Sequence, residues 1–276
     1  MRLFHYAAPR RVYQLAGQLQ PWLWATAALC GVAGLVLGFV IAPPDAVQGE
    51  VYRILFLHVP AAWLSMLLYL SMAFWAGLGW ALRARAASLM ARAIAPTGAV
   101  HTAVALWTGA LWGQPTWGTW WVWDARLTSE LLLLFLYLGW MALVQALDDQ
   151  PERADAAGAL LALVGAVNVP VIYFSVRWWN TLHQGASISL EAAPRMAATM
   201  LAALALCTLA CWAAALAVVL MRCRALLLER DGHARWVQAL RAPAHGRPRR
   251  PEPATTTTTT TTTPATASRS ARMETC

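Results

Sequence analysis

Six long apolar segments constrain the fold of this 276-residue chain more than any other feature. They lie at about residues 22–42, 58–82, 94–113, 128–147, 157–176 and 196–220. Each is close to the ~20 residues that an α-helix needs to cross a hydrocarbon layer about 30 Å thick. Because lipid offers no hydrogen bonds, the backbone of each segment must satisfy its own donors and acceptors, as a helix does. The sequence therefore predicts an all-α, polytopic membrane protein with six transmembrane helices.

The composition supports this class and excludes others. Only 12% of the residues are charged while 59% are hydrophobic, which leaves too little charge to cover a soluble domain. No basic patch alternates with aromatic residues, so nucleic acid is not an expected partner. All 21 cationic side chains are Arg, and the lack of Lys excludes a phosphate-binding P-loop. No acid–base pair with matched spacing is evident, so we expect the chain not to be an enzyme and ATP hydrolysis to belong to a partner.

The distribution of Arg predicts the orientation in the membrane. Residues 1–21, 83–93, 148–156 and the tail from 221 carry three, three, one and ten Arg, respectively. The alternate connections 43–57, 114–127 and 177–195 carry one, one and two. Positively charged segments stay in the cytoplasm. We therefore expect both termini to be cytoplasmic and these three connections to form outward loops.

The chain divides into two regions by composition. Residues 1–222 are predicted to form the six-helix membrane domain. Residues 223–276 are basic and rich in Thr and Pro, and from about residue 243 they contain almost no apolar side chain. Such a segment cannot bury enough surface to offset its ordering entropy. We predict a disordered cytoplasmic tail over 223–276.

The second outward loop carries an unusual density of tryptophan. Five indoles fall within twelve residues: Trp112, Trp117, Trp120, Trp121 and Trp123. Gly113, Pro115 and Gly118 are expected to break any helix there. An interfacial aromatic belt is the alternative interpretation, but a belt would scatter Trp over all loops. Flat, rigid aromatic faces on a tight backbone favour a flat, hydrophobic ring as the guest.

Charged residues follow these indoles directly. Arg126 can pair bidentately with a carboxylate, such as the propionate of a haem. Asp124 would orient either Arg126 or an indole N–H. Thr128, Ser129 and Glu130 are interpreted as the cap and first turn of the fourth helix.

Two histidines flank the tryptophan loop on the same side of the membrane. His58 begins the second span, with Pro60 suited to the first turn of a helix, and His183 lies in the third outward loop. Taken singly, each is an ordinary interfacial histidine. Together, with an aromatic platform between them, they match the needs of a six-coordinate haem. His101, within the third span, is a functional candidate by position, but we favour a neutral ring bonded to a helix carbonyl.

Two other classes of membrane protein are alternatives. A b-type cytochrome oxidoreductase usually holds its haem within the bilayer, between histidines on helix interiors, whereas His58 and His183 lie at one face. Reversible redox titration coupled to quinol would favour that class. A permease would need charges near mid-bilayer of a kind that these spans lack.

The tryptophan segment resembles a known domain. The run from Trp112 to Ser129, WGQPTWGTWWVWDARLTS, resembles the tryptophan-rich WWD domain of haem-handling proteins in bacterial cytochrome c maturation. The segments RILFLHVPAAW and WWNTLHQGASI are similar to flanking blocks of one such family, the haem exporter protein C (CcmC) family. That family has six helices and one histidine in each flanking outer loop, and the resemblance covers roughly residues 20–222.

The resemblance implies a site and a function. His58 and His183 correspond to the axial ligands of a haem b that is bound without a covalent link, and the chain has no C-x-x-C-H motif for covalent attachment. The WWD loop, at 112–130, would hold the haem at the periplasmic face of the bacterial inner membrane. Its expected haem-binding residues are Trp112, Trp117, Gly118, Trp120, Trp121, Trp123, Asp124 and Arg126.

The resemblance also implies partners. The haem would pass to the membrane-tethered haem chaperone CcmE. CcmA, which binds ATP, the channel-like CcmB and the small CcmD would form the haem-release complex with this chain, and membrane lipid would surround it.

Overall fold

A computed structural model describes residues 8–185 and 196–241, and every regular element within them is a helix. Six helical spans are long and apolar enough to cross a membrane: Pro9–Ile41, Val51–Leu82, Arg85–Trp117, Ala125–Ala146, Pro151–Trp178 and Ala198–Arg230. The predicted all-α architecture with six spans is confirmed. Several spans extend beyond the apolar limits expected from the sequence, because the helices continue into the polar residues at their ends.

Within the described residues, the six spans comprise seven α-helices and two short helical turns. The first two spans contain α2 (Pro9–Val36), the π-helical turn η1 (Leu37–Ile41), the 3-10 turn η2 (Val51–Ile54) and α3 (Leu55–Leu82). The next three contain α4 (Arg85–Trp117), α5 (Ala125–Ala146), α6 (Pro151–Gly165) and α7 (Asn168–Trp178). The last is α8 (Ala198–Arg230), which is followed by the short α9 (Arg235–Arg241). The fifth span is interrupted between α6 and α7, because Pro170 has no N–H to donate to the preceding turn.

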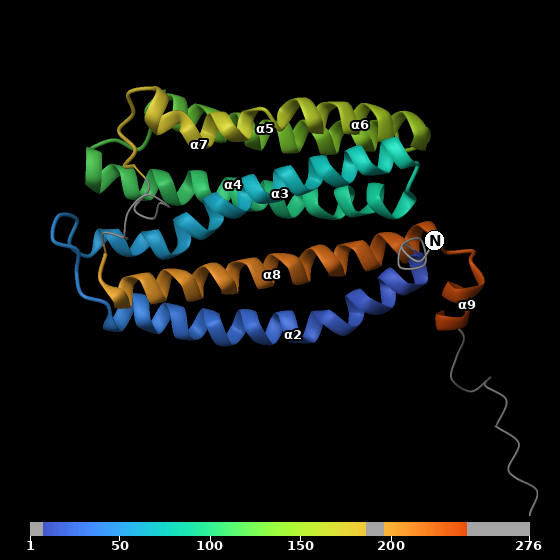
Figure 1. Ribbon diagram of the computed structural model, residues 1–276, viewed down its shortest axis with the longest axis horizontal. Coiled ribbons are helices and arrows are strands. Elements are labelled where there is room, and N and C mark those ends of the chain that lie inside the picture. The colour runs from blue at the N-terminus through green and yellow to red at the C-terminus, as the bar shows by residue number, and fades with distance from the viewer. Residues whose placement is uncertain (1–7, 186–195, 242–276) are drawn as a thin grey trace, which may run out of the picture.

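The helices form three layers (Figure 1). Helices α2 and α8 pack side by side, α3 and α4 form the central layer, and α5 with α6 and α7 forms the third. The main core lies between the central and third layers, around the fully buried Tyr69, Met72 and Tyr137. The Tyr137 hydroxyl donates a hydrogen bond of 2.8 Å to the carbonyl of Ser65, so this buried polar group is satisfied.

The alternation of the spans brings three loops together. Residues 42–50, 118–124 and 179–185 lie at one end of the bundle, which we call the outer end (Figure 1). The start of α2, the turn at 83–84, the turn at 147–150 and α9 lie at the opposite, inner end. At the outer end Arg53 donates to the carbonyls of Gly38 and Ala42, which satisfies acceptors at the end of the first span.

The tryptophan loop is shorter than predicted. Gly113 and Pro115 do not break the helix, and that expectation is wrong: α4 continues to Trp117. Pro115 lacks one N–H of the helix, but the Gly118 N–H still donates to the carbonyl of Gln114, so α4 continues past the proline. Only Gly118 ends α4, since its φ of 77° favours a residue without Cβ. The irregular backbone is therefore 118–124 rather than 112–130.

The predicted disordered tail is also corrected at its start. Residues 223–241 were expected to be disordered, yet α8 continues to Arg230 and α9 follows. Leu227 and Val237 are buried, and the Trp236 ring lies 5.6 Å from that of Tyr13 in α2. Apolar side chains between the arginines give these turns a face to bury. Residues 242–276, including the Thr run, lie outside the described residues.

Replacement of Gly98 tests the packing of the central layer against the third. A Cβ at Gly98 in α4 would overlap the Tyr137 ring, whereas a Cβ at Gly139 in α5 would meet nothing within 4 Å. We expect Gly98→Ala to destabilise the protein by about 1–3 kcal/mol through overpacking. The matched Gly139→Ala should be neutral or stabilising. Thermal unfolding in detergent would measure both, and equal midpoints would contradict this packing.

Candidate functional site

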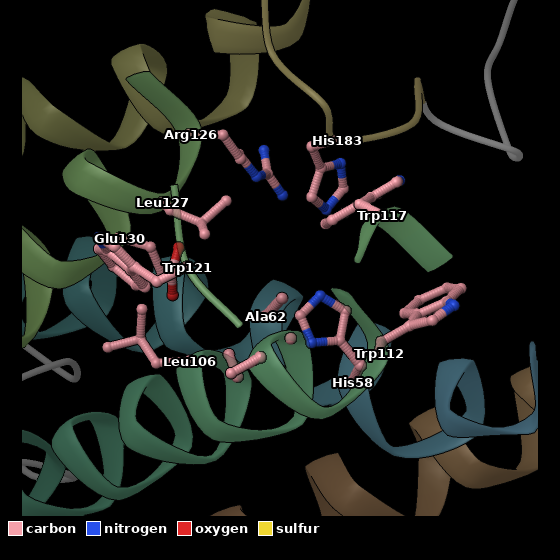
Figure 2. A pocket seen from close by; sticks show the side chains of 13 residues that line it. His58, Ala62, Leu106, Trp112, Trp117, Trp121, Arg126, Leu127, Glu130 and His183 are labelled. Carbon is pink, nitrogen blue, oxygen red and sulfur yellow. The ribbon is translucent and has the colours of Figure 1, made fainter. Parts of the chain in front are cut away.

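A cavity opens at the outer end between α3, α4, α5 and the loop after α7. It comprises about 530 Å³ of space, part of which is open to solvent. Its lining is mostly apolar and aromatic, with two histidines, one arginine and one glutamate (Figure 2). The lining residues are His58, Ala62, Ala105, Leu106, Gly109, Ala110, Trp112, Trp117, Trp121, Arg126, Leu127, Glu130 and His183.

The two histidines face one another across this cavity. His58 is the fourth residue of α3, and His183 lies in the loop that follows α7. Their ring centroids are 6.3 Å apart and the rings are inclined at 38° (Figure 2). A bond from an imidazole nitrogen to a first-row metal is about 2 Å long and the ring centre lies about 1 Å beyond, so two axial imidazoles on one iron have ring centres roughly 6 Å apart. The observed separation therefore suits a shared metal.

Hydrogen bonds fix the tautomer of His58. Its Nδ1 lies 3.0 Å from the hydroxyl oxygen of Thr108. That hydroxyl donates its only proton to the carbonyl of Val104, at 2.6 Å, and so accepts from the imidazole. Nδ1 then carries the ring proton, and Nε2 keeps a free lone pair. A hydrogen bond to the distal nitrogen is the usual support of a metal-binding histidine.

His183 has the same tautomer for a different reason. Its Nδ1 lies 2.7 Å from the carbonyl oxygen of Gln184, which can only accept. Burial lowers the pKa of the His183 imidazole below its ordinary value, and the nearby positive charge of Arg126 lowers this pKa further. The ring is therefore neutral at neutral pH, with Nε2 unprotonated. Both histidines present a nitrogen lone pair.

The cavity offers too few protein ligands for a bare metal ion. Over residues 8–185 and 196–241, no group of three or more His, Cys, Asp or Glu side chains is placed to hold one. Two imidazoles alone leave most positions of a six-coordinate metal open. A guest that brings four ligands in a plane of its own would complete the set.

Three of the five predicted indoles line the cavity. Trp112 meets the His58 ring edge-on at 5.7 Å, and Trp117 lies 6.2 Å from the His183 ring. Trp121 lies across the cavity from these two (Figure 2). The Trp112 indole donates to the side chain of Gln48 at 2.9 Å, which fixes its plane. The aromatic surfaces thus stand on opposite sides of the histidine pair.

Arg126 supplies the positive charge of the cavity. It lies in the first turn of α5, and its Nη1 donates to the carbonyl of Ile172 in α7 at 2.7 Å. Within the described residues it forms no ion pair with a carboxylate. The rest of the guanidinium faces the cavity (Figure 2). Arg126 can therefore bind an acid that enters from outside.

Asp124 does not line the cavity but positions a residue that does. Its Oδ1 accepts from the backbone of Leu127 at 2.8 Å, so Asp124 is the N-cap of α5, and the expectation that Thr128 and Ser129 cap this helix is wrong. Its other oxygen accepts from the Thr181 hydroxyl. Thr181 in turn accepts from the backbone N–H of His183 at 3.0 Å. Asp124 thus links the tryptophan loop to the His183 loop.

Three further predicted residues lie outside the cavity. Gly118 ends α4, and the side chains of Trp120 and Trp123 are 57% and 77% exposed.

The sequence did not identify Glu130 as a cavity residue, although its spacing of four from Arg126 places both on one helix face. Thr108 and Gln48 were also missed, since nothing near them in the sequence marks them. The Nδ1 of His101 donates to the carbonyl of Thr97, 2.8 Å away, in line with the favoured structural interpretation.

Comparison with known proteins assigns the family. The family model described as "Heme exporter protein C" matches residues 2–238. The chain belongs to the haem exporter protein C family. It is 52% identical to Heme exporter protein C of Escherichia coli (strain K12) over 185 residues, which are 67% of this chain and 75% of that protein. It is 46% identical to Heme exporter protein C of Haemophilus influenzae over 239 residues, which are 86% of this chain and 96% of that protein.

A third relative of the same name, from Bradyrhizobium diazoefficiens, is 50% identical over 190 residues, or 68% of this chain and 71% of that protein. Family membership agrees with the six apolar helices, and the chain is a multi-pass membrane protein.

The link from Asp124 to His183 can be tested by hydrogen exchange. Thr181→Val removes both side-chain bonds of Thr181, so we expect faster amide exchange in residues 179–185 alone. Asp124→Ala should do the same and also loosen the first turn of α5, at a cost of about 1 kcal/mol for the lost cap. Thr208→Val, which alters a similar hydroxyl within α8, should leave both segments unchanged. Unaltered exchange in the Thr181 variant would refute the link.

Proposed function

We propose that this chain binds haem in the outer-end cavity and delivers it to the haem chaperone CcmE during cytochrome c maturation. The observation that carries the proposal is the facing pair of His58 and His183, whose ring centroids are 6.3 Å apart. Their Nε2 lone pairs would occupy the two axial positions of the iron, and the porphyrin would supply the four equatorial nitrogens. No covalent bond to the porphyrin is needed, so the cargo is haem b.

The walls of the cavity support haem over a smaller metal complex. Trp112 and Trp117 lie on one side of the histidine pair and Trp121 on the other (Figure 2). Indole rings offer large, rigid, apolar surfaces to the faces and edge of a porphyrin. Arg126 would pair with a propionate, since its guanidinium is free of protein carboxylates among the described residues.

The direction of delivery follows from the charge at the two ends. The inner end carries most of the Arg and is expected to face the cytoplasm. The cavity would then open to the periplasm from a bacterial inner membrane, with lipid around the bundle. CcmA, CcmB and CcmD would be partners in releasing haem-loaded CcmE, and ATP hydrolysis would come from CcmA. The chain itself would be a binding and transfer factor and not an enzyme.

The alternative function is that of a b-type cytochrome oxidoreductase. Its haem would lie within the bilayer, between histidines on helix interiors. His101, which lies mid-span in α4, is bonded to its own helix and is not among the residues that line the cavity. Quinol-coupled, reversible reduction of the bound haem would favour this alternative, and transfer of the haem to CcmE would exclude it.

Replacement of each histidine tests the proposed ligands. Purified wild type should show the visible spectrum of a low-spin haem. We expect His58→Ala and His183→Ala each to lose that spectrum and retain less haem, because one axial bond to iron is removed. His233→Ala, which alters an exposed residue at the inner end, should match wild type. Wild-type spectra in both cavity variants would disprove the assignment.

The proposed pairing of Arg126 with a haem propionate can be tested with a haem that lacks carboxylates. We expect Arg126→Gln to bind haem roughly tenfold to hundredfold more weakly, since a hydrogen bond to a charged group contributes about 1.5–3 kcal/mol. Haem dimethyl ester lacks the carboxylates, so wild type and variant should bind it equally. Titration by absorbance would measure all four affinities, and a loss that persists with the ester would argue against propionate pairing.

A further inference from the structure

Glu130 is a cavity residue that the proposed binding of haem does not use. It lies in α5, four residues after Arg126 and one turn deeper in the bundle. Glu130 is only 7% exposed, and its oxygens face the cavity (Figure 2). An acidic group in this position requires a physical reason, because a buried carboxylate without compensation is costly.

The protein compensates only one of the two carboxylate oxygens. Oε1 lies 2.8 Å from the hydroxyl of Ser65 in α3, whose one proton is shared between this oxygen and the carbonyl of Ala62. Oε2 is buried and has no hydrogen-bond partner among the described residues. The Nε1 of Trp121, which lines the same cavity, is likewise buried without a partner. The deep wall of the cavity therefore holds polar atoms that the protein alone leaves unsatisfied.

The charge of the proposed cargo depends on its oxidation state. A porphyrin dianion with two neutral imidazoles leaves a net charge of +1 on a ferric centre and none on a ferrous centre. Glu130 in its ionised form would attract the first and gain nothing from the second, and the low polarity of the wall would strengthen that attraction. The propionates, by contrast, are repelled by Glu130 and directed toward Arg126.

We propose that Glu130 is the counter-charge that stabilises ferric haem in this cavity. The inference rests on the proposed binding of haem between His58 and His183. Glu130 touches neither axial position in this assignment, so it acts on the iron through its charge. Its consequence is a bound haem that resists reduction, which favours the ferric state of the cargo before delivery.

The midpoint potential of the bound haem tests this role. Purified full-length protein loaded with haem would be reduced stepwise with dithionite and redox mediators, which supply the one electron that converts ferric to ferrous iron. We expect Glu130→Gln to lower the ferric-to-ferrous ratio at a fixed potential about tenfold, which for a one-electron couple raises the midpoint by about 59 mV. Its low-spin spectrum should stay that of wild type, since both axial ligands remain.

Two control variants separate charge from structure. Glu130→Asp keeps the charge and should keep a midpoint near that of wild type. Asp155→Asn removes a carboxylate that is also bonded to a serine, Ser88, but lies toward the inner end, so it should not shift the midpoint. If Glu130→Gln fails to fold, Glu130→Met removes the same charge with an apolar side chain of similar length.

The outcomes for the two proposals are distinct. An unchanged midpoint in Glu130→Gln, with the low-spin spectrum intact, overturns the role of Glu130 and leaves the proposed haem binding in place. An equal shift in Asp155→Asn also overturns it, since the effect would then be non-specific. Absence of a low-spin haem in wild type refutes the proposed function itself.

Discussion

Lipid offers the peptide backbone no hydrogen bonds, and the arrangement of this chain follows from that constraint. Among the described residues, helices occupy the membrane-spanning part apart from the turn between α6 and α7, so most irregular backbone collects at the two ends of the bundle. With six spans, three loops must share the outer end, and they come from segments far apart in the sequence. His58, the tryptophan loop and His183 meet there although 125 positions separate the two histidines along the chain. The topology of the six spans thus brings the segments that form the cavity together.

Side-chain hydrogen bonds then fix the geometry that topology allows. Thr108 holds His58 from the neighbouring helix, and the Asp124–Thr181 pair holds the backbone of His183. His58 is held between two packed helices, whereas His183 lies on a loop whose position depends on two hydrogen bonds. A transfer factor needs a rigid site for loading and a ligand that can move away for release. In the proposed function, the different attachment of the two imidazoles would meet both needs.

The sequence predicted the architecture well because the relevant signals are local. Apolar segments of membrane length identify helices, and their alternation determines which loops share an end. The identity of the facing histidines and of Trp112, Trp117, Trp121 and Arg126 could be predicted for the same reason. The sequence could not predict contacts between distant elements, such as Ser65 with Glu130 or Gln48 with Trp112. These contacts depend on how each helix is rotated about its axis and how the elements pack. Pro115 misled the prediction, since it lies inside α4 without ending the helix.

The charges of the cavity form a pattern that no single residue reveals. Arg126 and Glu130 stand one turn apart on the same face of α5, with the arginine nearer to the outer end. A guest with acidic groups on one edge and a cationic centre would be oriented by this pair, since reversal would bring its acids against Glu130. A single helix can present two opposite charges at different depths of a cavity, because residues four apart project from the same face one turn apart. In the proposed function, the orientation of the haem would then be set by α5, while α3 and the loop after α7 would supply the axial ligands.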